Sequence, residues 1–200
     1  MESTSSFAFI TYRDDPIWPL VAEGRPADEC HTIMSIGYSA DAIIHLRKAG
    51  LPVSTVWAPP EAAGHWYAVT APANWRDRLP GVSTEEYARR VGEALFPTKP
   101  MAMVPKIFLL DDDIDPTDLA ELTWAIATRV HPTQRRAVFE DQFVAPVVMS
   151  YTEHEYAAGR GPKVVFDGLQ PPVGGGRLLH SSFAQAYPAE VRKRVIEKWQ

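Results

Sequence analysis

An acidic cluster follows a short apolar run in the middle of the chain. Lys106–Leu110 leads directly into the segment Asp111-Asp112-Asp113-Ile114-Asp115. Hard divalent cations prefer several carboxylate oxygens, so a strand that ends in aspartates is typical of metal-dependent phosphatases and nucleases. The alternative is a solvated loop at the carboxyl end of a strand, with Asp115 capping the helix that follows. Because no second acidic or histidine cluster lies downstream, we favour the loop and predict no metal site.

The other residues whose side chains could take part in catalysis or binding do not form a catalytic set. The six histidines show no HxH, HxxxH or HExxH spacing, which gives a zinc site little support. Cys30 and His31 are adjacent, so we expect their side chains to diverge and to form no nucleophile pair. The glycine-rich segments 159–163 and 174–176 lack the context of a phosphate-binding loop. From the residues alone we predict no catalytic residue in this chain.

Composition excludes several classes of protein. The chain has 200 residues, with 20 Lys+Arg against 25 Asp+Glu and a net charge of −5. No basic excess is present to neutralise phosphates, so we expect no nucleic-acid partner. No apolar run approaches the ~18 residues of a membrane span, and the first residues do not resemble a signal peptide. A single cysteine fits a reducing compartment, so we expect a cytoplasmic protein without a membrane partner.

Helical and strand patterns alternate along the chain. We expect helices at 39–49, 83–95, 117–128 and 188–199, and strands at 53–58, 65–71, 106–110, 144–149 and 163–166. Ser83 and Glu86 have the spacing of a capping box, and Pro116 suits a first helical turn after an Asp115 cap. Residues 1–30 are interrupted by prolines and predict an extended arm with one short strand at 7–12. The alternation predicts an α/β fold, a layered sheet with flanking helices.

The segment from Lys106 to Val130 resembles the C-terminal domain of the UbiD family of decarboxylases. The family pattern is a hydrophobic strand, a D-D-I-D motif (Asp112–Asp115) and a helix with W-A-x-x-T-R (Trp124–Arg129). Collinear segments agree over nearly the whole chain beyond about residue 12, and the agreement favours the ferulate and cinnamate branch. These segments are Pro19-Leu20, Gly24–Pro26, Asp28–Thr32, Ala49–Pro52, Arg90–Gly92, Lys163–Asp167, Tyr187–Val191 and Lys198-Trp199. Asp111 departs from the pattern, because the family has glycine there.

The resemblance implies that the chemistry is divided between two parts. In the family, a longer chain carries an N-terminal half that binds prenylated FMN, a divalent metal and potassium. That half also supplies the catalytic Arg and two Glu residues, and nothing in this chain matches it. The resemblance therefore implies that these cofactors and catalytic residues lie on a partner, an N-terminal-type UbiD subunit. The family's C-terminal domain closes over the cofactor, lines one wall of the substrate pocket and builds a dimer interface.

Four residues of this chain fall on functional positions of the family. Lys99 aligns with the lysine that reaches the cofactor phosphate, a task that suits a flexible ammonium group. Met34 falls on an aliphatic position that touches the substrate. Ala145 and Val147 fall where ferulate-type enzymes place a Phe and a Leu against the ring. Both side chains are smaller here, so the resemblance implies a roomier or reshaped pocket.

The resemblance also divides the chain and leads to a functional hypothesis. We expect an N-terminal arm (1–30), a UbiD C-terminal-like α/β domain (31–187) and a C-terminal oligomerisation helix (188–200) that forms a homodimer. The hypothesis is the small subunit of a split UbiD-like decarboxylase for an aromatic or unsaturated carboxylic acid, inactive without its partner. One alternative is a stand-alone binding or assembly protein that retains the fold. A weaker alternative is a metal-dependent hydrolase that uses the aspartates at 111–115.

Overall fold

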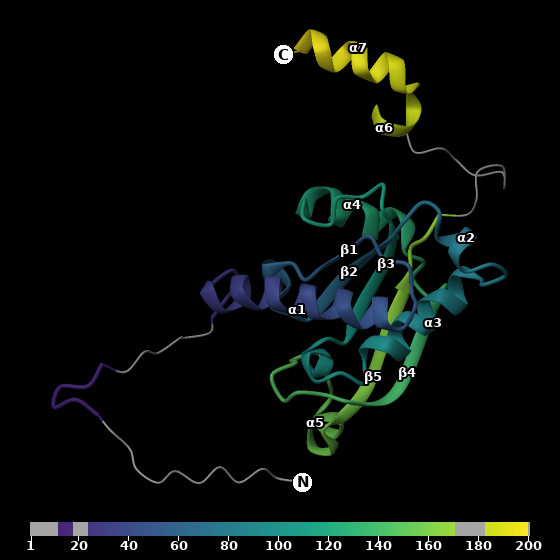
Figure 1. The fold of residues 1–200 in the computed structure, drawn as a ribbon. Coiled ribbons are helices and arrows are strands. Elements are labelled where there is room, and N and C mark those ends of the chain that lie inside the picture. Colours follow the sequence, from purple (N-terminus) through teal and green to yellow (C-terminus); the bar gives the residue numbers. More distant parts are fainter. Residues whose placement is uncertain (1–11, 18–23, 171–182, 200) are drawn as a thin grey trace.

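The central element of the computed structural model is a mixed five-stranded sheet with the strand order β1-β2-β3-β5-β4 (Figure 1). The structure describes residues 12–17, 24–170 and 183–199. The strands are β1 (Thr55–Trp57), β2 (Trp66–Ala71), β3 (Lys106–Asp111), β4 (Arg136–Phe143) and β5 (Arg160–Asp167). The three inner strands are parallel, and the two outer strands run antiparallel to their neighbours. This arrangement confirms the predicted α/β fold.

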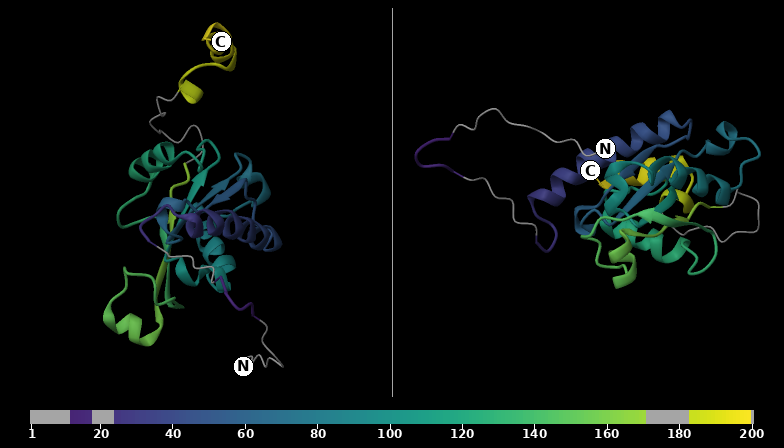
Figure 2. Two further views of the ribbon diagram at one scale, coloured as in Figure 1. Left: turned by 90° about the vertical axis from the view of Figure 1, so that its left-hand side faces the viewer. Right: turned by 90° about the horizontal axis from the view of Figure 1, so that it is seen from below.

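Helices lie between and after the strands in the sequence. They are α1 (Glu29–Lys48), α2 (Trp75–Arg78), α3 (Thr84–Leu95), α4 (Leu119–Arg129), α5 (Glu153–Ala158), α6 (Phe183–Ala186) and α7 (Ala189–Trp199), with 3-10 turns η1 (Pro60–Ala62) and η2 (Lys99–Met103). α4 and α5 lie at opposite ends of the strands, as Figures 1 and 2 both show. Among the described helices, none is long and apolar enough to cross a membrane.

The main core lies between α1, α3 and one face of the sheet. Successive residues of a strand point to opposite faces, and the residues on this face are fully or almost fully buried. They include Tyr67 and Val69 of β2, Ile107 and Leu109 of β3, and Val165 of β5. From α3, the buried residues Val91 and Leu95 follow the 3.6-residue helical period and pack onto them.

The other face of the sheet is only partly covered. A small second core forms where α4 packs over the carboxyl ends of the inner strands, through Leu122 and Ala125 against Ala68 and Leu110. Beyond α4, a row of half-buried aromatic rings crosses three strands. Trp66 meets Phe108 edge-on at 5.4 Å between centroids, and Phe108 stacks on Phe166 at 5.2 Å. Part of this face therefore offers apolar surface to a neighbour.

Two predicted helix starts were wrong, because the real caps lie elsewhere. α1 begins ten residues before Ser39, and its N-cap Asp28 accepts a hydrogen bond from the His31 N–H in a capping box. Ser39 lies buried inside this helix, where its hydroxyl accepts from the Ala58 N–H. α4 begins after Asp118 and not after Asp115. The carboxylate of Asp115 instead accepts a hydrogen bond from the Thr117 N–H in a tight turn. The cap of α3 at Ser83 is confirmed.

The polar segment before residue 144 forms a strand that the sequence pattern did not predict. β4 lies at the edge of the sheet with one face open to solvent, so its sequence RAVFEDQF carries many polar residues. The apolar run 144–149, expected as a strand, forms a loop with turns. The predicted helix at 188–199 is confirmed as α7. The predicted strand at 7–12, apart from Tyr12, and the triple-glycine loop lie outside the described residues.

α3 approaches the sheet closely at Gly92. A Cβ atom at this position would lie 2.3 Å from two ring carbons of Phe139 and 3.1 Å from a methyl group of Val165. The Phe139 ring packs edge-on against Phe96, so it has little freedom to move away. Glycine at position 92 therefore sets the distance between α3 and the two strands β4 and β5.

We predict that Gly92→Ala destabilises the protein by about 1–3 kcal/mol through overpacking. The matched control is Gly37→Ala in the exposed surface of α1, where nothing lies within 4 Å of the new methyl group. There, alanine should stabilise the helix by about 0.5–1 kcal/mol. Urea unfolding of both variants measures the two effects. Equal free energies of unfolding for the two variants would contradict the close approach at Gly92.

Candidate functional site

One corner of the domain gathers η2, the loop 144–149 and the start of β5. η2 leads through Val104 and Pro105 into β3, so it lies at the amino end of that strand. The Ala145 N–H donates to the carbonyl of Ala102 in η2 at 3.0 Å. The preceding Val144 N–H donates to the Gly159 carbonyl, just before β5, at 3.1 Å. Segments far apart in the sequence are thus joined by main-chain hydrogen bonds.

Lys163 fixes this corner from inside the domain. Its side chain is 1% exposed, and its Nζ donates a hydrogen bond to the carbonyl of Met101 in η2. The ammonium group also lies 5.5 Å from the centre of the Phe96 ring, in a cation–π contact. Burial lowers the pKa of Lys163 to about 8, since the charged form loses its hydration. Sequence analysis missed this role, because a lysine in a strand gives no sign that its side chain is buried.

The four residues named by the resemblance lie on three elements, η2, the loop 144–149 and α1. Lys99 is exposed at the first position of η2, and Ala145 is half-buried beside that turn. Val147 is 50% exposed in the same loop. Met34 is half-buried on α1. The structure thus places Ala145 beside the turn that carries Lys99, while Met34 belongs to a separate element.

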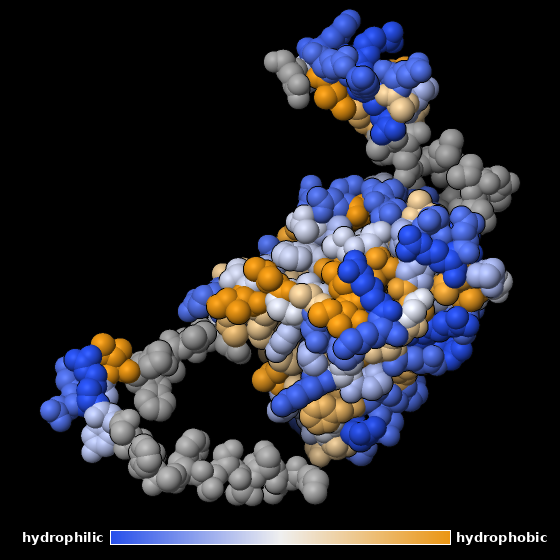
Figure 3. Space-filling model, viewed as in Figure 1, coloured by the Kyte–Doolittle hydropathy of each residue, from blue (hydrophilic) through white to orange (hydrophobic). Residues whose placement is uncertain are grey.

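The outer surface of α1 carries an exposed apolar stripe. Ile33 is 71% exposed, Ile36 is 67% exposed and Ile44 is 49% exposed. Their spacing places them along one side of the helix, and Figure 3 shows apolar surface over α1. Met34 lies next to Ile33 in the sequence. Large exposed aliphatic side chains in a row are typical of a surface that packs against another protein.

At the opposite end of the strands, the acidic cluster is occupied by protein partners. The two carboxylate oxygens of Asp113 accept from the Arg129 guanidinium at 2.7 and 2.8 Å. Arg129 is almost fully buried, and its guanidinium lies 5.4 Å from the ring centre of Trp124. Asp115 accepts from the N–H and the hydroxyl of Thr117. These carboxylates hold the loop between β3 and α4.

The remaining two aspartates of the cluster tie β3 to other segments. Asp111 accepts from the Gln170 N–H at 2.6 Å, and Asp112 accepts from the Ser54 hydroxyl at 3.0 Å. Burial raises the pKa of Asp111 to about 6, although the hydrogen bond from Gln170 acts in the opposite direction. Among the described residues, no three His, Cys, Asp or Glu side chains are grouped as metal ligands. The cluster therefore has a structural explanation.

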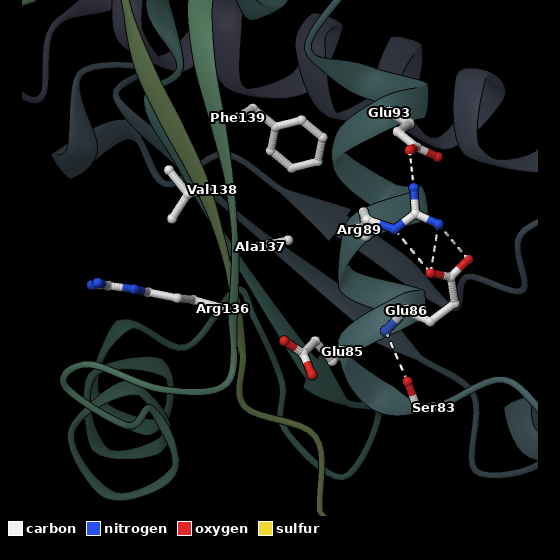
Figure 4. A pocket seen from close by; sticks show the side chains of 9 residues that line it. All are labelled: Ser83, Glu85, Glu86, Arg89, Glu93, Arg136, Ala137, Val138 and Phe139. Atoms are coloured by element: carbon white, nitrogen blue, oxygen red, sulfur yellow. Dashed lines mark hydrogen bonds and ion pairs between the residues drawn. The ribbon is translucent and has the colours of Figure 1, made fainter.

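A surface groove of about 440 Å³ lies between α3 and β4, away from the residues named by the resemblance (Figure 4). Its charged groups are largely satisfied within α3, where Arg89 pairs with both Glu86 and Glu93. Ala137 and Phe139 of β4 point toward α3, whereas Arg136 and Val138 point to the other side. The groove thus follows an open edge of the sheet and contains no candidate catalytic group.

The raised pKa of Asp111 predicts how stability depends on pH. The folded state holds the proton up to about pH 6, whereas the unfolded chain releases it near the ordinary value of 3.8. Stability should therefore fall as pH rises from about 4 through about 6. Asp111→Asn keeps an acceptor for Gln170 and removes this loss, so it should stabilise the protein at pH 7.5 by about 1–3 kcal/mol. Thermal unfolding at several pH values measures the difference.

The matched control is Asp112→Asn in the exposed part of the same loop. It removes a carboxylate of the same size, which accepts from the Ser54 hydroxyl, and so it controls for the loss of one negative charge at this end of β3. If Asp111→Asn shows the same slope as the wild type, Asp111 does not titrate in this range.

Comparison with known proteins gives a family match. Residues 31–168 match the model of the C-terminal domain of 3-octaprenyl-4-hydroxybenzoate carboxy-lyase, UbiD. Pyrrole-2-carboxylic acid decarboxylase of Pseudomonas aeruginosa is 35% identical over 192 residues, which are 95% of this chain and 38% of that protein. Ferulic acid decarboxylase 1 of Saccharomyces cerevisiae is 27% identical over 193 residues, with the same two coverages. This chain therefore spans well under half the length of these relatives.

Solved structures share the fold. The open form of vanillic acid decarboxylase from Sedimentibacter hydroxybenzoicus superposes with a TM-score of 0.60 at 20% identity, over 87% of this chain and 34% of that chain. The UbiD-class enzyme HmfF from Pelotomaculum thermopropionicum, in complex with FMN, gives 0.58 at 20% identity, over 78% and 32%. Residues 31–168, which match the family model, contain the sheet, α3, α4 and the corner around η2. By this match over residues 31–168, the chain belongs to the UbiD family of decarboxylases through its C-terminal domain.

Proposed function

We propose that this chain is the small subunit of a split UbiD-like decarboxylase. It closes the active site of a partner that binds prenylated FMN, a divalent metal and potassium and that carries the catalytic Arg/Glu/Glu set. Family membership and the FMN held by a UbiD-class enzyme of the same fold support this proposal. The single cysteine suggests that the enzyme works in the cytoplasm.

The observation that carries the proposal is the apolar stripe on α1. A domain that works by itself covers most of its large aliphatic side chains, yet Ile33 and Ile36 are about two-thirds exposed or more. Met34, which the resemblance assigns to the substrate wall, lies on the same helix. We infer that α1 packs against the partner and thereby places Met34 near the active site.

Lys99 and the loop residues have distinct roles in this proposal. The exposed ammonium of Lys99 reaches the cofactor phosphate, since a point charge on a flexible stem suits a phosphate group. Ala145 and Val147 line the pocket with apolar surface, which orients the acid and excludes water. The cofactor, bound mainly by the partner, supplies the bond-breaking chemistry. This chain contributes orientation and closure, and Lys163 keeps the turn of Lys99 in place.

The substrate in this proposal is an aromatic or unsaturated carboxylic acid. The two relatives named above are a pyrrole-2-carboxylic acid decarboxylase and a ferulic acid decarboxylase, so their substrates differ in ring size and in the position of the acid. The ferulic acid decarboxylase represents the ferulate and cinnamate branch, and the pyrrole-2-carboxylic acid decarboxylase represents a second class of substrate. Ala145 is small, which favours an acid with a larger ring system.

We further propose that α7 contributes to a homodimer. None of its residues is buried, and Val195, Ile196 and Trp199 are exposed large apolar side chains. Basic residues such as Arg194 and Lys198 occupy other positions on the helix. An amphipathic helix of this kind stabilises itself by laying its apolar side on a neighbour, and Trp199 is a suitable anchor.

We predict that substitutions at Ala145 and Lys99 affect different functions, substrate preference and cofactor retention respectively. In the complex of this chain with an N-terminal-type UbiD subunit loaded with prenylated FMN, Ala145→Phe should fill pocket space. Preference should shift toward smaller aromatic acids by about tenfold or more, because each lost buried CH2 contact costs the larger acid about 0.8 kcal/mol. Lys99→Ala should instead weaken cofactor retention by about tenfold, the value of a lost charge-assisted contact, without changing preference. CO2 release and flavin absorbance measure the two effects.

The controls test the proposal as a whole. The chain alone should release no CO2, and Ile36→Glu on the α1 stripe should abolish co-purification with the partner while the variant stays folded. Identical substrate profiles for the wild type and Ala145→Phe would remove this residue from the pocket wall. If co-expression with an N-terminal-type subunit gives neither a complex nor activity, the chain is a stand-alone binding or assembly protein.

A further inference from the structure

The main chain just beyond β5 is held by charged side chains from other parts of the domain. Leu169 is fully buried in the main core. Its N–H donates to a carboxylate oxygen of Asp167 at 3.0 Å, and its carbonyl accepts from the Arg135 guanidinium, which also pairs with Asp167. Both main-chain polar groups of Leu169 are therefore bonded, and its side chain is fixed by packing.

The next residue, Gln170, is held by two charged side chains. Its N–H donates to Oδ2 of Asp111, at the end of β3, at 2.6 Å. Its carbonyl accepts from Arg76 of α2, also at 2.6 Å. The half-buried side chain of Gln170 has its amide nitrogen buried without a hydrogen-bond partner among the described residues. This nitrogen gains hydrogen bonds to water if Gln170 leaves its position, which lowers the free energy of leaving.

The contrast between these two residues defines a hinge. Leu169 can move only if the main core opens, whereas Gln170 moves once its contacts with Asp111 and Arg76 break. The next two residues in the sequence are prolines, which have no backbone N–H for the domain to hold. Because α6 and α7 follow later in the sequence, Gln170 sets the direction in which the C-terminal segment leaves the domain.

Asp111 is the part of this hinge that can change its charge. Two guanidinium groups face it, Arg76 of α2 and Arg129 of α4, whose Nη1 lies 3.9 Å from Oδ2. The acidic neighbour is Asp113 in the loop after β3, and Arg129 holds it in a bidentate pair. An arginine side chain keeps its charge throughout the range in which carboxylates titrate. The charge of this cluster therefore changes when the Asp111 carboxyl gains or loses a proton.

We propose that Asp111 and Gln170 form a pH-dependent latch on the C-terminal segment. While the Asp111 carboxyl keeps its proton, Gln170 stays in place. When the proton is lost to solvent, the buried carboxylate gains hydration if Gln170 turns away about Leu169, so the latch opens. The latch thereby regulates the direction from which the exposed apolar side chains of α7 reach a neighbour. A glycine at position 111, as in the family pattern, has no side chain to form it.

Proton linkage gives the direction of the pH effect. In the closed latch, burial outweighs the hydrogen bond from Gln170 and raises the pKa of Asp111 to about 6. In the open latch, water reaches the carboxyl and its pKa returns toward the ordinary value of 3.8. The closed state thus binds more protons between these two values, and rising pH favours opening. From about pH 5 to about pH 7.5 the opening constant should increase about tenfold.

Amide hydrogen exchange of the full chain, resolved for single residues by NMR, tests the latch. Each rate is divided by the intrinsic exchange rate at the same pH, so that only opening is compared. In the wild type, the Gln170 N–H should exchange ahead of the Leu169 N–H. Its protection should fall about tenfold between about pH 5 and about pH 7.5. Leu169 is the internal control, because its N–H also donates to a carboxylate but is released only with the core.

Three variants separate the contributions to the latch. Asp111→Asn keeps an acceptor and has no proton to lose, so the protection of Gln170 should be the same at both pH values. Arg76→Gln loses the charged donor to the Gln170 carbonyl and should lower protection about tenfold at both, with the pH response retained. Asp112→Asn removes a carboxylate that bonds Ser54 and not Gln170, and should keep the wild-type response. Thermal unfolding shows that each variant folds.

The same measurements can overturn the proposal. Equal protection of Gln170 and Leu169 at both pH values would show that no local opening occurs. A pH response that persists in Asp111→Asn, or that disappears in Asp112→Asn, would assign the titration to another group. Every readout uses this chain alone, so the latch goes beyond the decarboxylase role proposed above and stands or fails independently of it.

Discussion

A buried ammonium group holds the candidate site together. Lys163 reaches from β5, an inner strand of the sheet, to the Met101 carbonyl of η2, and η2 in turn holds the loop of Ala145 through the Ala102 carbonyl. Burying a charge without a carboxylate partner is costly, and the lowered pKa of Lys163 shows this cost. Such a contact persists only where the surrounding packing fixes both groups. The corner that carries Lys99 and Ala145 is thus anchored in the main core, although its residues lie on turns and loops.

The motif residues that first suggested metal chemistry turn out to hold the fold. Asp113 of the D-D-I-D motif and Arg129 of the W-A-x-x-T-R motif form a bidentate ion pair, and Trp124 of the same motif lies against the guanidinium. The two motifs therefore belong to one structural unit that fastens α4 to the end of β3. Because Arg129 is nearly inaccessible to solvent, loss of Asp113 would leave a buried charge with only the more distant carboxylate of Asp111, at 3.9 Å, to balance it.

Several surfaces of the domain are incomplete by themselves. The stripe on α1, the free edge of β4 and the half-covered aromatic row on the second face each expose groups that folded proteins usually cover. They lie on different elements, so more than one neighbour is needed to cover them. These exposed surfaces are the physical reason for proposing an assembly.

The sequence by itself determined the fold class, the apolar inner strands and the start of α3. Apolar runs and the Ser83 cap are local signals, and each produced the expected element. Sequence similarity likewise pointed to the UbiD C-terminal domain. Local signals failed where a residue's environment comes from distant segments. Asp28 replaced Ser39 as the cap of α1 because Ser39 is buried against Ala58, and polar β4 became a strand because β5 lies beside it. The burial of Lys163 and the position of β4 at the edge of the sheet were decided only by tertiary structure, since each depends on which strands and helices become neighbours.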